Sequence, residues 1–170
     1  MDKMLAKIRL KTLTVAIIFS FIGLTAPIYA ENPDHVAKLK NTKQCPGCDL
    51  SGADLSNLNL KNANLKGANL RSANLERSNL LQADLEGAIL TGANLGGANL
   101  IGANLKNAKL NSANLGGVKF MDANLTGASL ANAYIWDANF TGADMSGVIL
   151  NGTQSCNGAI APDGSRGIRC

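Results

Sequence analysis

Large apolar side chains recur at every fifth residue from Leu50 to Leu150, at 21 positions without interruption. Seventeen of these residues are Leu, and the other four are Phe120, Ile135, Phe140 and Met145. The residue two places earlier is usually Ala, as in Ala63 before Leu65. Steps of five residues rotate about 140° around a helix and alternate between the faces of a strand, so neither straight element gives one apolar side. The chain must therefore bend once per repeat, with each large residue and its Ala facing one axis.

Turn-forming and outward positions fit this repeat. The residue two places after each large one is Gly in about half of the repeats, and Asn or Asp in several others (Asn57, Asn62, Asn107, Asp122, Asn132 and Asp137). These residues tolerate the positive φ that many turns require. Asn stands directly before most large residues, as in Asn64 and Asn69. We expect a turn in every repeat, and Asn side chains that stack outward on successive coils and hydrogen-bond to one another.

The repeat unit has a recognisable sequence pattern, Ala-Asn/Asp-Leu followed by two variable residues, as in residues 53–57 and 68–72. Over residues 48–152 this sequence pattern resembles that of the pentapeptide-repeat family. The resemblance implies an all-β fold, a right-handed quadrilateral β-helix with four repeats per coil and about five coils. Such stacks gain stability from contacts between neighbouring coils, and one solenoid domain accounts for this part of the chain.

The first thirty residues have a different character. Four basic residues precede an apolar run over residues 13–24, and Pro27 and Ala30 follow it. This layout predicts a secretory signal peptide over residues 1–30, with cleavage after Ala30. We therefore expect an exported protein of the periplasm, thylakoid lumen or extracellular space, with no membrane span after signal removal. An uncleaved membrane anchor is the alternative, because Ile28 is less typical of a cleavage site than Ala.

Residues 31–47 predict an N-terminal cap, and residues 153–170 a C-terminal capping tail. Asp34 can cap a short helix that runs to about Asn41, with Val36 and Leu39 on one face. Covering the ends of a β-solenoid protects unpaired backbone groups from aggregation. We expect His35 to be a surface residue of the N-terminal cap.

The four cysteines lie at the two ends of the repeats, Cys45 and Cys48 at the start, Cys156 and Cys170 after the last copy. A disulfide needs Cα atoms within about 7 Å, so pairing at each end is favoured over pairing across the stack. We predict a Cys156–Cys170 disulfide that fixes the tail. Cys45 and Cys48 form a Cys-Pro-Gly-Cys motif, for which a structural cap or local disulfide is favoured over redox chemistry.

Several function classes receive no support. The sequence shows no enzyme signature, no metal-ligand cluster and no cofactor motif, so we expect no catalytic residue, metal or cofactor. Some members of the resembled family mimic B-DNA and bind DNA topoisomerases. Residues 49–151 carry eight acids and seven bases, which disfavours such mimicry, and the interleaved charges disfavour nucleic-acid binding.

A twenty-residue coil would sort outward residues into vertical columns. One column reads Lys61, Leu81, Ile101, Met121 and Thr141, and another reads Ser56, Glu76, Gly96, Gly116 and Trp136. Leu81, Ile101 and Met121 are a candidate interaction face, because contiguous exposed apolar area marks contact surfaces. Three tolerated surface side chains remain the alternative interpretation. Tyr134 and Trp136 are a candidate aromatic contact, and we expect the C-terminal tail to cover them.

The sequence thus predicts a non-enzymatic, exported structural or protein-interaction scaffold with an unknown protein partner. Oligomerisation through one end or the apolar face is a further expectation. A dithiol redox protein is the first alternative, and a DNA-mimic protein that binds topoisomerase is the second.

Overall fold

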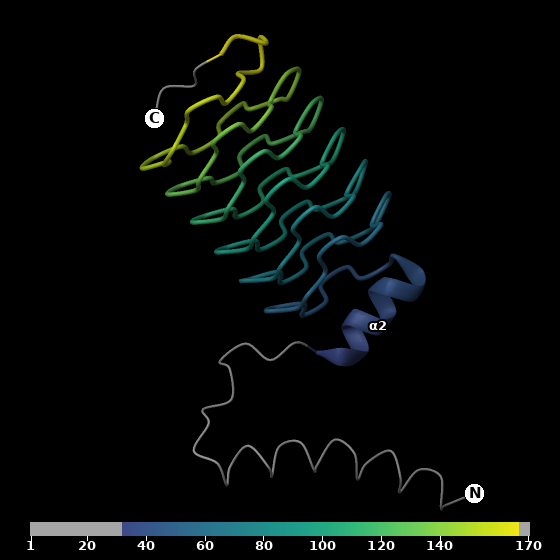
Figure 1. Cartoon of the computed structure of the whole chain (residues 1–170). Coiled ribbons are helices and arrows are strands. Elements are labelled where there is room, and N and C mark those ends of the chain that lie inside the picture. Colours follow the sequence, from purple (N-terminus) through teal and green to yellow (C-terminus); the bar gives the residue numbers. More distant parts are fainter. Residues whose placement is uncertain (1–31, 167–170) are drawn as a thin grey trace, which may run out of the picture. The chain divides into compact units, whose positions relative to one another are not determined.

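The computed structural model describes residues 32–166, which contain one helix and a stack of coils (Figure 1). The predicted signal segment and Cys170 lie outside the described residues. The chain divides into two units, residues 1–30 and residues 31–170, and the second contains all of the structure described below. No helix within residues 32–166 has the length and apolar character needed to cross a membrane.

The coils pair with one another at a constant spacing of twenty residues. Parallel bridges join Gln44 to Asn64 and continue every five residues as far as the bridge from Tyr134 to Gln154. Each side of a coil contributes a single bridged residue, and the described stack contains no longer strand. Four pentapeptides therefore close one coil, as the resemblance implies.

Every corner of the coils has the positive φ that the sequence predicts. Each fifth residue from Gly47 to Gly152 has a positive φ. Ten of these residues are not glycine: Asn57, Asn62, Ser72, Arg77, Gln82, Asn107, Ser112, Asp122, Asn132 and Asp137. A hydrogen bond closes nearly every corner, as from the Ala68 N–H to the Leu65 carbonyl at 2.9 Å. The repeat imposes this conformation even on Arg77 and Gln82, whose types rarely adopt it.

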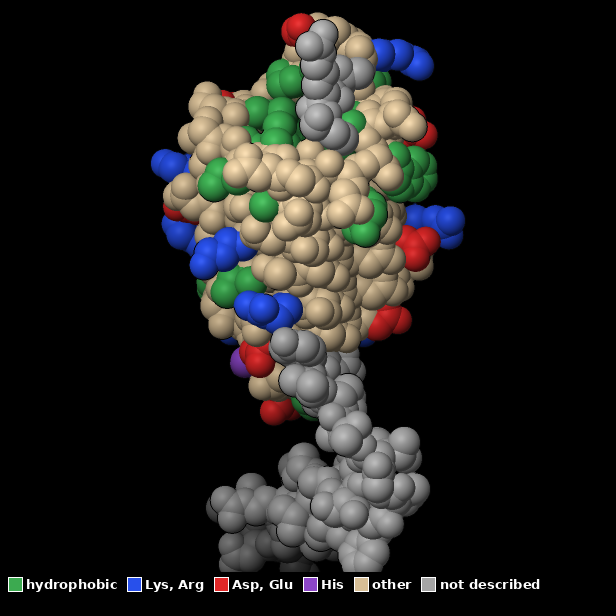
Figure 2. Space-filling view, turned by 90° about the vertical axis from the view of Figure 1, so that its left-hand side faces the viewer, with side chains coloured by type: hydrophobic (Ala, Val, Ile, Leu, Met, Phe, Trp, Pro, Cys, Tyr) green, Lys and Arg blue, Asp and Glu red, His purple; other side chains and the backbone are tan. Residues whose placement is uncertain are grey.

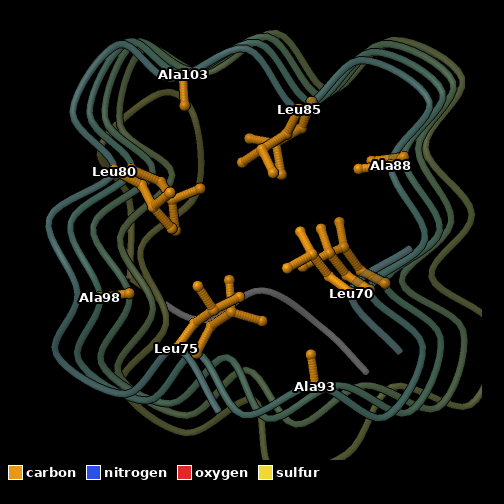
Figure 3. Close-up of a cluster of buried hydrophobic side chains, with 14 of the residues drawn as sticks. Leu70, Leu75, Leu80, Leu85, Ala88, Ala93, Ala98 and Ala103 are labelled. Atoms are coloured by element: carbon orange, nitrogen blue, oxygen red, sulfur yellow. The ribbon is translucent and has the colours of Figure 1, made fainter. Parts of the chain in front are cut away.

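The core fills the inside of the coils with alternating large and small side chains. Leu70, Leu75, Leu80 and Leu85 point inward from the four sides of one coil, with alanines between the leucines (Figure 3). These leucines are fully buried. Phe120 and Phe140 occupy one column in successive coils, and their rings stack with centroids 5.0 Å apart. Close packing of this kind leaves little room for size changes at the inward positions.

The outward Asn and Asp side chains form the predicted ladders. The Asn94 carboxamide oxygen accepts the Gly96 N–H at 3.1 Å and the Asn114 amide at 2.9 Å. Asn94 in turn donates to Asn74 at 3.3 Å. The Asn94 side chain thus stabilises the turn of its own repeat and hydrogen-bonds to the coils on both sides. The prediction of stacked Asn side chains is confirmed.

Helix α2, Pro33–Thr42, covers the first coil. Its N-cap is Asn32, whose side chain accepts the N–H groups of Asp34 and His35, so the prediction that Asp34 is the cap was wrong. Pro33 explains the shift, because proline suits the first helical position and Asn32 then precedes the helix. Val36 and Leu39 are buried in the end of the core, as their spacing predicted.

The tail adds a partial coil on the opposite end. One extra residue breaks the register there, since Tyr134 bridges to Gln154 but Asn139 bridges to Ile160. Ser155 is exposed with a positive φ, and the buried Cys156 follows it. The insertion therefore places a cysteine where the unbroken repeat would have placed Ser155 inward.

Candidate functional site

Two exposed features of the stack are candidates for a functional site: the apolar column and a groove beside Trp136. In the apolar column, the Gln82 N–H donates to the Ile101 carbonyl and the Gly102 N–H to the Met121 carbonyl, both at 2.9 Å. Leu81, Ile101 and Met121 are therefore aligned on successive coils. All three side chains are half-buried, so the column is a low apolar strip on the surface.

The aromatic pair is more exposed than expected. Trp136 is 48% exposed and Tyr134 is 43% exposed, so the prediction that the tail covers them was wrong. The tail pairs with the backbone here, through the Tyr134–Gln154 bridge and a bond from the Asp137 N–H to the Asn157 carbonyl. Backbone pairing leaves outward side chains free, because they project away from the stacking direction.

The Trp136 indole lies on Gly116, one coil earlier in the same column. A methyl group at the Gly116 Cβ position would overlap the indole atoms Nε1, Cε2 and Cζ2. Gly116 is accordingly buried, although outward positions of the repeat are otherwise mostly accessible. Because Gly116 has no side chain, the indole packs directly against the backbone.

A groove of about 300 Å³ opens next to this contact. Gly96 and Gly97 in one coil and Gly116 and Gly117 in the next form its floor, and Trp136 forms one wall. Glu76 and Arg77 line the opposite end. We call this feature, lined by Glu76, Arg77, Gly96, Gly97, Gly116, Gly117 and Trp136, the Trp136 groove.

The floor of the groove offers no free backbone N–H. The Gly96 and Gly116 N–H groups each donate to the preceding Asn side chain at 3.1 Å. Those of Gly97 and Gly117 each donate to a carbonyl of the next coil at 2.8 Å. Such a floor gives an anion no hydrogen-bond donor, unlike the glycine-rich loops that bind phosphate.

The rim carries one charge of each sign. The Glu76 carboxylate accepts from the Asn94 amide at 3.4 Å and lies 3.7 Å from Nε of Arg77. Both charged side chains are largely in solvent, with 42% and 74% of their surfaces exposed. The rim is therefore close to neutral, and Arg77 is its more exposed side.

Sequence reasoning identified Trp136 but missed the rest of this groove. The available signal was the column that contains Gly96 and Gly116 in succession below Trp136. Two neighbouring glycines at coil spacing leave a gap in a column that elsewhere holds side chains. Gly97 and Gly117 extend the gap sideways at the corner.

The Cys-Pro-Gly-Cys motif is a buried disulfide in this structure. Cys45 and Cys48 are bonded, with Cα atoms 5.3 Å apart, and are 0% and 3% exposed. The Cys45 sulfur lies 3.4 Å from the His35 carbonyl oxygen in the first turn of helix α2, and an electronegative neighbour of this kind does not favour a thiolate. Thiol exchange also requires access to sulfur, so the geometry favours a structural cap over redox chemistry. Cys156 is also disulfide-bonded, but the predicted Cys156–Cys170 pairing stays a prediction because Cys170 is outside the described residues.

His35 has a structural role that the sequence did not reveal. The Asp49 N–H donates to Nδ1 of His35 at 3.0 Å, and the Asp49 carbonyl oxygen lies 3.2 Å from the same nitrogen. This bond ties helix α2 to the first repeat, and His35 is half-buried, so the expectation of a simple surface residue was wrong. Within residues 32–166, no group of three or more His, Cys, Asp or Glu side chains could hold a metal ion.

The surface charges are dispersed. On the face that Figure 2 shows, Lys and Arg side chains are interleaved with Asp and Glu side chains. Lys66 and Glu86, on successive coils, form an ion pair at 2.8 Å. This pairing raises the pKa of Lys66 and lowers the pKa of Glu86. A surface with alternating signs resembles neither a DNA duplex nor a basic nucleic-acid-binding strip.

Comparison with known proteins agrees with this architecture. The family model described as "Pentapeptide repeats" matches eight copies in residues 48–87, 78–117, 88–127 and 119–154, which together cover more than half of the chain. No curated protein sequence matched the chain.

Solved structures of three proteins are similar to this chain. HetL, a pentapeptide repeat protein involved in heterocyst differentiation regulation from the cyanobacterium Nostoc sp. strain PCC 7120, is 35% identical with a TM-score of 0.60, over 73% of this chain and 66% of HetL. QnrB1, a plasmid-mediated fluoroquinolone resistance protein, is 24% identical with a TM-score of 0.55, over 68% of this chain and 62% of QnrB1, a likeness that concerns the fold alone. Rfr23 from the cyanobacterium Cyanothece 51142 is 31% identical with a TM-score of 0.40, over 75% of this chain and 97% of Rfr23.

These matches span slightly less than two thirds of HetL and of QnrB1. The sequence pattern of the repeats, the twenty-residue spacing of the bridges and the family-model match over residues 48–154 agree with one another. The chain belongs to the pentapeptide-repeat family.

Proposed function

We propose that this protein is an exported, non-enzymatic scaffold that binds another protein through the outer faces of a right-handed stack of about five coils. One observation carries the proposal: a stack with a packed core and capped ends presents apolar side chains on its outside. Leu81, Ile101 and Met121 form a strip, and Tyr134 and Trp136 are nearly half exposed. Aromatic and apolar side chains on a rigid support are typical of contact surfaces.

The capped ends support a role that depends on a persistent shape. Helix α2 with the Cys45–Cys48 disulfide covers one end, and the tail covers part of the other. A scaffold needs its faces held in fixed register, and hydrogen bonds between neighbouring coils provide this throughout residues 44–154. The function is therefore assigned to side chains on the faces, since the repeats themselves specify only the shape.

Affinity capture from the envelope fraction tests the proposal. Protein in which Leu81, Ile101 and Met121 are changed to Ser should lose a partner that the unchanged protein retains, because the strip loses its apolar surface. Changing Thr91 and Thr126 to Ser is the matched control, since these residues occupy the same position of the repeat in other columns. Equal capture by all three proteins would contradict the assignment of the strip as the contact surface.

Export is tested separately, by locating the N-terminus of the mature protein. N-terminal sequencing of the mature protein should begin at Glu31, because the proposed signal ends at Ala30. A protein that retains its first thirty residues in the membrane fraction would instead support the anchor alternative.

A further inference from the structure

The Trp136 groove interrupts one of the vertical columns of outward side chains. Outward positions of this column carry Ser56, Glu76 and Trp136, whereas Gly96 and Gly116 carry no side chain. Trp136 fills the space over Gly116, which leaves the space over Gly96 open between the indole and Glu76. The gap is thus one missing side chain wide in a column where neighbouring side chains are present.

The chemistry of the groove selects an uncharged, apolar occupant. All four floor N–H groups are already bonded, so the floor offers a phosphate or carboxylate no backbone donor. Glu76 and Arg77 are oppositely charged neighbours, so the rim favours neither a cation nor an anion. The remaining surface consists of glycine backbone and the Trp136 indole, against which a flat apolar group packs well.

We propose that the Trp136 groove receives an aromatic side chain of a protein partner, packed on Gly96 and Gly97 and against the Trp136 indole. Aromatic pairs contribute beyond the area that they bury, and Trp and Arg are enriched among residues that dominate protein interfaces. Glu76 and Arg77 would contact the partner's backbone at the rim, where one accepts and the other donates hydrogen bonds. This inference rests on the proposed scaffold function and assigns it a second contact, separate from the apolar strip.

Trp136 is the only tryptophan in the chain, so its fluorescence reports directly on the groove. Titration with N-acetyl-phenylalaninamide, excited where phenylalanine does not absorb, should give a saturable change with half-saturation on the order of 1–10 mM. In an amide NMR spectrum, the peaks of Gly96, Gly97, Gly116 and Gly117 should shift together with the Trp136 indole peak. N-acetyl-lysinamide, methyl glucoside and inorganic phosphate should produce no saturable change.

A variant that fills the gap provides the contrast. Gly96→Leu should raise the half-saturation concentration at least tenfold, because Leu81 and Ile101 show that this position of the repeat accepts a large side chain. Thr126→Leu is the matched control on another face and should leave the titration unchanged. A Cβ at Gly96 would lie 3.3 Å from the Asn94 carboxamide oxygen in either variant, so Gly96→Ser, which adds only a hydroxyl beyond the Cβ, is the second variant if the larger Leu disturbs folding.

Several outcomes would overturn the inference. They are the absence of saturation by the phenylalanine probe, saturation by the lysine, sugar or phosphate probe alone, and equal titration of the wild-type protein and both Gly96 variants. The scaffold proposal fails separately, because it depends on loss of capture when the apolar strip is changed. A groove that binds no probe in a protein whose capture depends on the strip would remove only the second contact.

Discussion

At the scale of single residues, the Asn and Asp that precede most of the large core residues provide most of the side-chain hydrogen bonds on the outer faces. Each side-chain oxygen accepts the N–H two residues later, and Asn also donates to the coil beside it. At Asp54 and Asp144, which replace Asn, a hydroxyl from the same repeat approaches the carboxylate. The Ser56 hydroxyl, with the Ser56 N–H, lowers the pKa of Asp54, and Ser146 lowers the pKa of Asp144 in the same way.

These aspartates predict a loss of stability in acid. A carboxylate whose pKa is lowered on folding stabilises the folded state above the unfolded pKa of about 3.9, and this contribution disappears as the pH falls through the folded value. Replacing Asp54 and Asp144 by Asn keeps the corner bond without the titrating group. The double variant should therefore lose less melting temperature between pH 5 and pH 3 than the wild-type protein, as measured by circular dichroism.

Ser56→Ala is the matched control at constant charge. Without the Ser56 hydroxyl, the pKa of Asp54 should return towards its usual value, and the acid sensitivity should decrease in the same direction. An identical pH dependence in wild type and both variants would show that other groups govern acid unfolding.

At the scale of elements, helix α2 illustrates how a non-repeating segment joins a repeating one. Its apolar residues Val36 and Leu39 enter the end of the core, and their spacing predicted this. The precise attachment depends on His35, which receives the Asp49 N–H from a residue fourteen positions later. No periodicity connects these two residues, so only the folded chain shows the contact.

The His35 contact predicts a local change in stability. His35→Ala should lower the free energy of unfolding by about 1 kcal/mol, because the Asp49 N–H loses its acceptor. Hydrogen exchange at the Asp49 amide should accelerate, whereas exchange at the Asn94 amide in the middle of the stack should stay unchanged. Lys38→Ala, at an exposed position of the same helix, is the control. Unchanged exchange at Asp49 would contradict a role for His35 in attaching α2.

At the scale of the whole stack, stability is distributed over equivalent coils. Every coil bonds to the next through the same backbone pattern, and its core residues contact similar residues above and below. Removing one complete coil should therefore keep the pairing between coils, because each later residue then occupies the equivalent position one coil earlier in the stack. Removing part of one repeat should bring outward residues into the core.

Deletion of residues 105–124 tests this expectation. The shortened protein should fold cooperatively, melt at a lower temperature and show a smaller denaturant m-value, because less surface is buried. Trp136 would then lie over Gly96, since Gly116 is removed with the deleted coil. Deletion of residues 105–107 is the contrast, and it should prevent folding because later leucines leave the inward positions. Equal loss of folding in both deletions would show that the coils are not interchangeable.

The period of five in the sequence by itself determined the inward Leu and Ala positions, the corners and the Asn ladders. These features follow from the local backbone conformation of each repeat and from the same contact between neighbouring coils, so every copy of the repeat specifies them in the same way. The N-cap at Asn32, the inserted Ser155 and the contact of His35 with Asp49 could not be read from the period, because each lies where the repetition ends. The Trp136 groove required the tertiary structure for a related reason. Its residues belong to four coils, and only their stacking brings a tryptophan, four glycines and a charged rim around one space.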